Sequence, residues 1–408
     1  MPKRRRGRTR DELAKTLGLD KGAVHVTNPD VGGGFGMKGM DYPEYFSVAA
    51  AARALGRPVR WISERTEAML TDNGGRDLVS DTTLAFDADH RLLAYHVDTI
   101  CNLGSYNSGY AQPIQTDLFV KVATGVYDVR DVALRCQGIY TNTTQIDAYR
   151  GAGRPEAIFA LERSMDNAAR ELGVDPWELR RRNFIKPDQF PYKTALADTY
   201  DVGDFERVLD RVTAEADREG FEARRTASVA KGKLRGLGLC YYIESILGDK
   251  EETARIENAD DGGVNLYVGT QSNGQGHETV YASFLSDQTG IPVEAIRIVQ
   301  GDSDLIETGG GTGGSRSVTV QNTATLATVD VMTRAFAGYL ADKLDAKDVT
   351  FDDERFRVPG SNETPTMLDV AAMAREDGRD DLLNFRETIE LEARSFPNGA
   401  HIAEVEID

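Results

Sequence analysis

The chain has 408 residues, 40% of them hydrophobic, and a formal net charge of −18 at pH 7. This length and apolar content support a sizeable core in two or three domains. The acidic balance disfavours nucleic-acid binding, because a negative surface repels phosphate backbones. We find no apolar run long enough for a membrane span, and no apolar segment after the basic stretch Met1–Arg10. We therefore expect a cytoplasmic protein that begins with a solvated tail.

The cysteines and histidines do not indicate a metal site. Cys101, Cys136 and Cys240 are far apart in the sequence and form no CxxC pair, so they cannot build a zinc ribbon or an iron–sulfur cluster. We expect three buried, reduced thiols. The five histidines show no spacing typical of metal ligands.

Hydrophobic periodicity and turn residues predict the elements of the first part of the chain. In chain order they predict a helix over 11–19, a strand over 23–27, a glycine-rich loop over 32–36, a helix that ends before Gly56, and a strand over 59–62. The second helix is expected to begin at Asp41, with Glu44 completing a capping box.

Strands and helices without strict alternation follow, which favours an α+β fold. The predicted elements are strands over 82–86, 92–100 and 132–139, helices over 156–172, 177–183 and 205–219, strands over 236–242, 252–256 and 264–268, helices over 278–289, 320–344 and 368–375, and a strand over 401–407. The stretch 228–235 lacks apolar periodicity and marks a domain boundary.

Three glycine-rich loops each join a predicted strand to a predicted helix. They are Val31–Lys38, Gly269–Thr279 and Gly309–Ser317. Glycine lets a backbone approach a ligand closely, and a helix N-terminus adds roughly half a positive charge. Such loops suit a pyrophosphate or a metal-oxo group. A fourth segment, Asp147–Glu156, places two arginines beside glycines before a helix, and arginine is a planar donor to phosphate or carboxylate.

The first loop also permits a competing interpretation. Gly34–Gly39 matches GxGxxG, the outline of a dinucleotide-binding fingerprint and hence of an NAD-dependent dehydrogenase. Asn28–Val31 and two further glycines separate this match from the predicted strand, where the true turn is tight. A phosphate-binding Walker A motif is excluded, because Lys38 is followed by Gly39.

Taken together, four segments resemble one family. Val31–Lys38, Ala148–Glu156, Gly269–Thr279 and Thr308–Ser317 have the order and approximate spacing of the large, molybdopterin-binding subunit of molybdenum hydroxylases, the xanthine dehydrogenase, aldehyde oxidase and aerobic CO dehydrogenase family. Leu55–Arg65 also looks like that family. The resemblance implies two elongated molybdopterin-binding domains, over 23–230 and 231–408, after a basic tail and short helix over 1–22.

The resemblance assigns site residues, with the cofactor between the two domains. Cofactor-binding residues would be Gly34, Phe35 and Gly36 beside the molybdenum, Arg150 in its pocket, Gln275 with Gly274 and Gly276 at the pterin, and Thr312, Gly313, Gly314 and Ser315 at the dinucleotide phosphates. Gln271 and His277 would also bind the cofactor. Substrate-facing residues would be Phe35, Arg76, Tyr149 and Ala152. No side chain would ligate the molybdenum directly, since the pterin holds it.

The implied reaction hydroxylates an aldehyde or an N-heterocycle with oxygen from water. The cofactor would be molybdopterin cytosine dinucleotide with molybdenum. The 2Fe-2S clusters and FAD would reside on partners, an iron–sulfur small subunit and an FAD-binding medium subunit, in a dimer of heterotrimers.

Three departures from the family pattern limit the range of possible substrates. Gly151–Gly153 lacks the cysteine of CO-oxidising members, and Gly39 replaces the glutamate of purine-oxidising members. Ala152 replaces an aromatic residue that would stack on a flat substrate, which favours a more open pocket.

The resemblance also implies a chain truncated at both ends, with the second domain incomplete. The family's N-terminal domain is missing, and the Gly-Glu motif that carries the catalytic glutamate lies beyond the equivalent of Asp408. No catalytic residue is therefore assigned, and we expect the chain to be inactive alone. The alternatives are a non-catalytic cofactor-binding remnant of the same family, or the NAD-dependent dehydrogenase.

Overall fold

The computed structural model describes residues 6–246 and 248–408, which form two compact units. Unit 1 comprises the described residues of Met1–Gly34, Asp41–Ile62 and Leu247–Ala393, and unit 2 comprises Phe35–Met40, Ser63–Ile246 and Arg394–Asp408. Both units are discontinuous along the chain. The domains predicted from the sequence were continuous segments, 23–230 and 231–408, and these boundaries stay a prediction.

Unit 1 is built on a four-stranded sheet with the order β12–β7–β8–β9. The strands are β7 (Glu251–Asn258), β8 (Val264–Val268), β9 (Ile296–Val299) and β12 (Asn384–Glu390). β12, β7 and β8 pair antiparallel, while β8 and β9 pair parallel. Alternate residues Val264, Leu266 and Val268 are buried, as expected for a strand with one face in a core.

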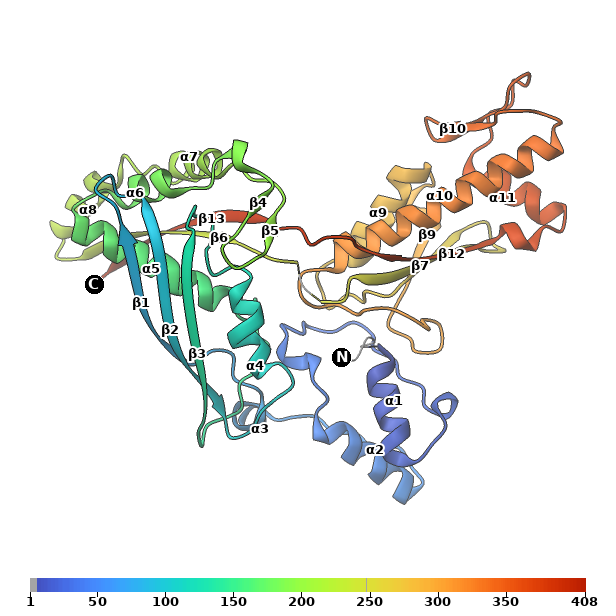
Figure 1. Cartoon of the computed structure of the whole chain (residues 1–408). Helices are drawn as coiled ribbons and strands as arrows, with labels where there is room; N and C mark the ends of the chain where they lie inside the picture. Colours follow the sequence, from blue (N-terminus) through green and yellow to red (C-terminus); the bar gives the residue numbers. More distant parts are fainter. Residues whose placement is uncertain (1–5, 247) are drawn as a thin grey trace. The chain divides into compact units, whose positions relative to one another are not determined.

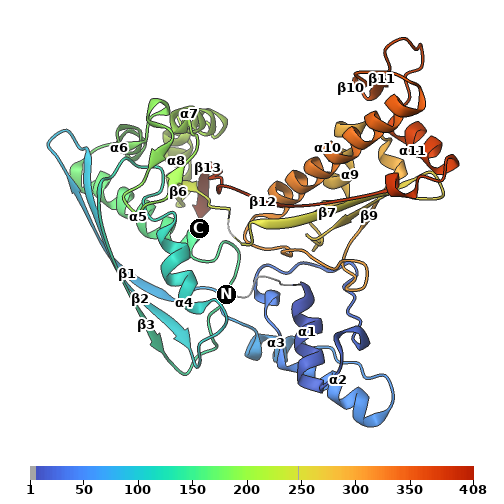
Figure 2. The same cartoon turned by 45° about the vertical axis from the view of Figure 1, so that its right-hand side comes forward.

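Helices α9 (His277–Thr289) and α10 (Ser317–Lys343) pack on this sheet and on each other (Figure 2). In α10, Thr328, Met332, Phe336 and Leu340 recur every four residues and are buried, so one stripe of the helix faces the core. The remaining elements of unit 1 are α1 (Arg6–Leu17), η1 (Lys21–Ala23), α2 (Pro43–Leu55), η5 (Val293–Ala295), β10 (Thr350–Asp352), β11 (Arg355–Arg357), α11 (Met367–Glu376) and η6 (Asp380–Leu382).

Unit 2 contains a three-stranded sheet of β1 (Leu78–Phe86), β2 (Leu92–Gly104) and β3 (Asp131–Tyr140). β1 runs antiparallel to β2, and β3 runs parallel to it. Helix α5 (Arg154–Leu172) lies against this sheet (Figure 1), with the expected stripe residues Ile158, Leu161 and Met165 buried. The stripe ends before Leu172, which is 38% exposed.

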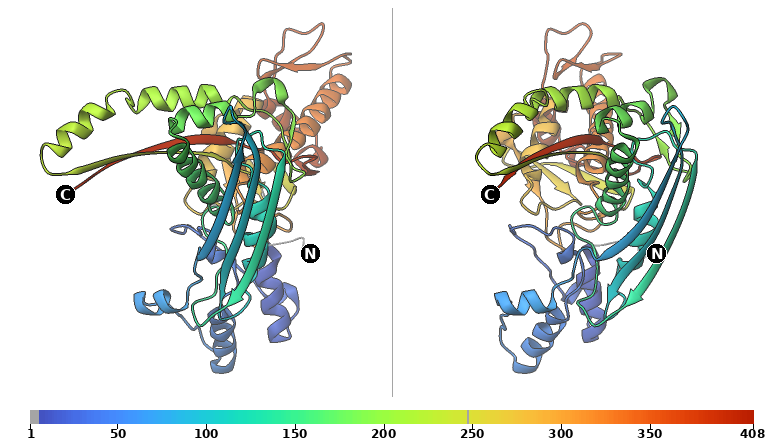
Figure 3. Two further views of the ribbon diagram at one scale, coloured as in Figure 1. Left: turned by 60° about the vertical axis from the view of Figure 1, so that its left-hand side comes forward. Right: turned by 90° about the vertical axis from the view of Figure 1, so that its left-hand side faces the viewer.

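A long two-stranded ribbon forms the other part of unit 2. β6 (Leu234–Ile243) and β13 (Asn398–Ile407) pair antiparallel, and α7 (Phe205–Glu215) and α8 (Phe221–Val229) run along the ribbon (Figure 3). The remaining elements are η2 (Met37–Gly39), α3 (Arg65–Thr71), α4 (Ala111–Pro113), η3 (Ile114–Leu118), α6 (Pro176–Asn183), η4 (Pro187–Gln189), β4 (Tyr192–Lys193) and β5 (Thr199–Tyr200).

The α+β class and most expected elements are confirmed, but two strands are wrong. Residues 23–27 contain the end of η1 and an isolated bridge from Thr27 to Asp302, and residues 59–62 form no strand. Without a strand before it, and with only the short η2 inside it, the Gly34–Gly39 match lacks the strand–turn–helix context of a dinucleotide site. The dehydrogenase alternative is therefore wrong.

Two predicted helix starts are also corrected. Asp41 does not cap α2, because its carboxylate accepts a hydrogen bond from Thr9 Oγ1 at 3.0 Å and Tyr42 takes the N-cap position before Pro43. The end at Gly56 is confirmed, with φ of 64°. The expected solvated tail falls partly outside the described residues at 1–5, and α1 already begins at Arg6.

The helices were examined for the length and apolar content of a membrane span. Among the helices of residues 6–246 and 248–408, none combines the length and the apolar content needed to cross a bilayer.

Candidate functional site

The segment Asp147–Glu156, here called the arginine loop, has an unusual backbone in unit 2. Arg150, Gly151, Ala152 and Gly153 have successive φ angles of 21°, 97°, 38° and 91°. Glycine accepts such angles without strain, whereas Arg150 and Ala152 do not. Strained residues persist only when their surroundings hold them, and they concentrate at functional sites.

Arg76 holds the arginine loop in this conformation. Its Nη2 donates to Tyr149 O at 3.0 Å and also to Arg150 O, and its Nε lies 3.3 Å from Glu156 Oε1. Arg76 was expected to face a substrate, but these contacts engage its guanidinium with the protein. Its role at a substrate stays a prediction.

Glu156 connects Arg76 to the start of helix α5. Its side chain is 1% exposed, and its Oε2 accepts the Gly153 N–H at 2.8 Å. Burial raises the pKa of Glu156 above its ordinary value, opposed by its backbone hydrogen bonds and the charges of Arg76 and Arg154. The carboxylate thus ties the strained loop to the helix.

The first glycine-rich loop contacts the arginine loop within unit 2. Phe35 O accepts the Arg150 N–H at 2.9 Å, and the Arg150 guanidinium lies 4.7 Å from the centre of the Phe35 ring. A Cβ on Gly36, whose φ is 96°, would lie 2.9 Å from Ala148 O, so glycine is required there. Phe35 is 45% exposed and Arg150 is also exposed, so both can reach a ligand.

Unit 1 brings the other two glycine-rich loops together. Thr312 Oγ1 donates to Gln271 O, and Gln271 Nε2 donates to Asn28 O at 3.1 Å. Gly34 also belongs to this group, since a Cβ on it would lie 3.5 Å from Asn273 Nδ2. The loops are therefore joined to each other and to the segment before the first loop.

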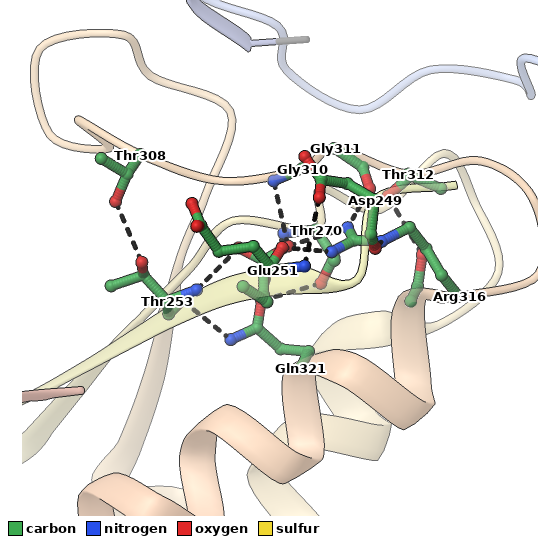
Figure 4. A network of polar contacts seen from close by, with 12 residues as sticks. Asp249, Glu251, Thr253, Thr270, Thr308, Gly310, Gly311, Thr312, Arg316 and Gln321 are labelled. Atoms are coloured by element: carbon green, nitrogen blue, oxygen red, sulfur yellow. Dashed lines mark hydrogen bonds and ion pairs between the residues drawn. The ribbon is translucent and has the colours of Figure 1, made fainter. Parts of the chain in front are cut away.

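A buried ion pair anchors the third loop (Figure 4). Arg316 Nη1 lies 2.8 Å from Glu252 Oε2 and 2.7 Å from Gly311 O, while its other nitrogens donate to Asp249 O and Glu251 O. The two charged side chains are 1% and 0% exposed. Glu252 Oε2 also accepts the Gly310 N–H at 3.2 Å, so the pair holds the backbone at Gly310 and Gly311.

Helices α9 and α10 begin directly after these two loops. Gly274 and Gly276 have φ angles of 104° and 76°, and both are exposed, as are Gln275 and Ser315. A Cβ on Gly276 would have no atom within 4 Å, so the backbone at the start of α9 is open to an approaching group. The N-terminus of α9 after exposed glycines, and the N-terminus of α10 after the exposed Ser315, suit an anionic ligand such as a pyrophosphate.

His277 and Gln275 have partners inside the protein. The His277 ring is 3% exposed, with Nδ1 3.1 Å from Thr270 O, and Gln275 Oε1 accepts the Asn273 N–H at 2.5 Å. The His277 ring is therefore engaged inside unit 1, and its role at a cofactor stays a prediction.

The expected site residues thus fall into two sets. Unit 2 holds Phe35, Gly36, Arg76, Tyr149, Arg150 and Ala152, and unit 1 holds Gly34, Gln271, Gly274, Gln275, Gly276, His277, Thr312, Gly313, Gly314 and Ser315. Sequence reasoning missed the buried supports Glu156, Glu252 and Arg316. The position of Arg316 inside a glycine-rich motif could have indicated its supporting role. Glu252 lies within a strand, and no pattern around it indicated such a role.

Two cysteines and His25 contact residues that are distant from them in the sequence. The three thiols were expected to be buried, but only Cys101 is, while Cys136 and Cys240 are partly buried. The sulfur atoms of Cys101 and Cys136 lie 3.6 Å apart on neighbouring strands. His25 Nε2 lies 3.0 Å from Asp302 Oδ1.

Two family models match almost the whole chain. Both describe a molybdopterin cofactor-binding domain, and they match residues 6–184 and 211–408. The arginine loop lies in the first match, and the second and third glycine-rich loops lie in the second.

Curated relatives match along nearly the full chain. The carbon monoxide dehydrogenase large chain of Hydrogenophaga pseudoflava is 32% identical over 98% of this chain and 52% of its own length. The 6-hydroxypseudooxynicotine dehydrogenase complex subunit gamma of Paenarthrobacter nicotinovorans is 30% identical over 97% of this chain and 51% of its own length. The chain therefore spans about half the length of these relatives.

A solved structure shares the fold. Quinoline 2-oxidoreductase from Pseudomonas putida 86 superposes with a TM-score of 0.90 and 30% identity, over 100% of this chain and 54% of that one. The Cu,Mo-CO dehydrogenase superposes with a TM-score of 0.89 and 29% identity, over 98% of this chain and 53% of that one.

Proposed function

Since this chain belongs to the molybdenum hydroxylase family, we propose that it is the molybdopterin-binding part of an oxidoreductase that hydroxylates an aldehyde or an N-heterocycle. The carrying observation is that both molybdopterin-binding domains are present and that each holds the loops expected of it in ordered contact.

The donors of unit 1 fit a pterin dinucleotide. Exposed glycines at the start of α9, and the Thr312–Ser315 loop before α10, lie at two helix N-termini, and the adjacent Arg316 guanidinium is held by Glu252 and by backbone carbonyls. We propose the cytosine dinucleotide form, with Gln275 and its glycines at the pterin and Thr312–Ser315 at the phosphates. The bound cofactor would supply oxygen transfer from water and accept two electrons.

The residues of unit 2 would position the substrate. Phe35 provides an exposed apolar face, and the Arg150 guanidinium stacked on it provides a donor for a carbonyl oxygen or a ring nitrogen. Gly151–Gly153 offers no thiol, so we do not propose CO oxidation, although a CO dehydrogenase is among the relatives.

A proton acceptor is not evident among these residues. Glu156 is the carboxylate that contacts the arginine loop: its Oε1 forms an ion pair with Arg76 and its Oε2 accepts the Gly153 N–H. We therefore assign Glu156 a positioning role. We propose that the chain alone binds the cofactor without turning over substrate.

The proposed partners carry the electrons away. The three cysteines do not provide the four thiolates of an iron–sulfur cluster. An iron–sulfur small subunit and an FAD-binding medium subunit would supply these centres, in a dimer of heterotrimers in the cytoplasm.

Dye reduction by the assembled complex tests this proposal. The chain, purified in the complete complex that supplies the proton acceptor, the iron–sulfur clusters and the flavin, is offered benzaldehyde, quinoline or CO in the presence of an artificial electron acceptor. We expect reduction with an aldehyde or the heterocycle and none with CO. Arg150→Met should abolish turnover, while Arg163→Met, on the exposed side of α5, should not. Turnover of CO alone, or equal rates in both variants, would refute the assignment.

A further inference from the structure

A histidine and two aspartates from distant parts of the sequence meet on the surface of unit 1. His25 Nε2 lies 3.0 Å from Asp302 Oδ1 and 3.8 Å from Asp304 Oδ2, and the three ligand atoms all lie within 4.8 Å of one another. Their side chains are 52%, 26% and 62% exposed, so an ion from solvent can reach them.

The backbone around this cluster is fixed by pairing rather than by the cluster itself. Asn28 N donates to Gly301 O at 2.8 Å, and Ser303 N donates to Val26 O at 3.1 Å. These bonds flank Thr27 on one segment and Asp302 on the other, at the antiparallel bridge between them, and His25 lies two residues before Thr27. The imidazole and the first carboxylate are therefore held beside each other.

Each carboxylate keeps a lone pair for a ligand. Asp302 Oδ1 accepts the Asp304 N–H at 2.8 Å, which orients that carboxylate toward His25. Asp304 Oδ1 lies 3.5 Å from the Ser303 hydroxyl, so its Oδ2, the atom nearer to His25, remains available. The cation Arg10 contacts the same segment, since its Nη1 donates to Ser303 O at 3.1 Å.

We propose that His25, Asp302 and Asp304 bind one divalent transition metal ion, with Zn²⁺ as the representative. One imidazole nitrogen and two carboxylate oxygens suit zinc, whereas Mg²⁺ and Ca²⁺ prefer oxygen ligands alone. Bonds of about 2.0–2.2 Å in a tetrahedral site place ligand atoms roughly 3.4 Å apart, which the two His25 distances bracket. Water completes the coordination, since the cluster is exposed.

Such an ion would stabilise the loops of unit 1. Residues 24–28 lead into the first glycine-rich loop, and Asn28 O accepts from Gln271 in the second. The 300–304 segment also supports the second loop, through Gln300 Oε1 and the Ser272 N–H at 2.8 Å. The metal would join these segments independently of molybdopterin, so its presence does not depend on the proposed reaction.

Calorimetric titration of the full, tag-free chain with ZnCl₂ tests this site. We expect uptake of one Zn²⁺ per chain, weakened at least about tenfold by His25→Ala and by Asp304→Asn. Asp304→Asn keeps the side-chain shape, so folding should be unaffected. His96→Ala, an exposed histidine on β2, is the matched control and should bind as the original chain does.

A rise in melting temperature with Zn²⁺ is the second readout, because a ligand that binds only the folded state stabilises it. The rise should occur in the original chain and in His96→Ala, and should be lost in the two site variants. No uptake by the original chain would overturn the proposal. Equal uptake by His25→Ala and His96→Ala, or unchanged binding in Asp304→Asn, would overturn it as well.

Discussion

Replacing Arg316 with methionine should strongly destabilise unit 1. The guanidinium is 1% exposed and donates to Glu252, Gly311 and two further backbone carbonyls. Methionine fills part of the volume but leaves the Glu252 carboxylate buried with only the Gly310 and Thr253 N–H groups. Removing one partner of a buried ion pair costs about 3–5 kcal/mol, so we expect a loss of that size in the free energy of unfolding.

Urea denaturation followed by circular dichroism measures this loss, and hydrogen exchange at the start of α10 localises it. Arg386→Met is the matched control, because Arg386 pairs with Glu307 at an exposed position, with side chains 43% and 72% exposed. Exposed pairs contribute about 0–1 kcal/mol. A loss below about 1 kcal/mol in Arg316→Met, or equal losses in the two variants, would refute the anchoring role of the pair.

Three further predictions concern unit 2. Arg76→Met should lower the free energy of unfolding of unit 2 by about 1–3 kcal/mol in urea denaturation, because two backbone carbonyls lose their donor and the buried Glu156 carboxylate loses its ion-pair partner; a change within about 0.5 kcal/mol would contradict this. Gly36→Ala should reduce bound pterin, measured by fluorescence after oxidation, because its Cβ would lie 2.9 Å from Ala148 O; full pterin content would exclude the close approach. Hydrogen bonds from Arg224 and Arg235 lower the pKa of Glu404 to about 2, so the stability that ionised Glu404 contributes is complete above its ordinary pKa of 4.5 and is lost as pH falls toward 2. Glu404→Gln should therefore be less stable than the original chain at pH 6 and nearly as stable at pH 2. A stability difference that stays constant with pH in acid denaturation would contradict this pH dependence.

Elements with a long periodic pattern were predictable from the sequence, because their burial follows from local spacing. The stripe of α5 and the alternation of β8 are examples. The strand expected over 59–62 failed because β-branched residues favour a strand only where another strand pairs with them. The start of α2 was misplaced because Asp41 bonds to Thr9, 32 residues earlier in the sequence.

The exposed parts of the candidate site were predictable, and the supports beneath them were not. Glycine and arginine motifs marked the loops directly. Glu252 lies 64 residues from Arg316, and His25 lies 277 residues from Asp302, so no local pattern connects either pair. The strain at Arg150 and Ala152 was equally hidden, since nothing in their side chains favours a positive φ.

The cofactor content of the purified chain reports whether this chain binds a molybdopterin dinucleotide. Molybdenum and cytidine monophosphate, released by acid from the chain produced in a host that makes the cofactor, measure this directly. We predict one molybdenum and one cytidine monophosphate per chain. A purified, folded chain that carries neither would contradict the account.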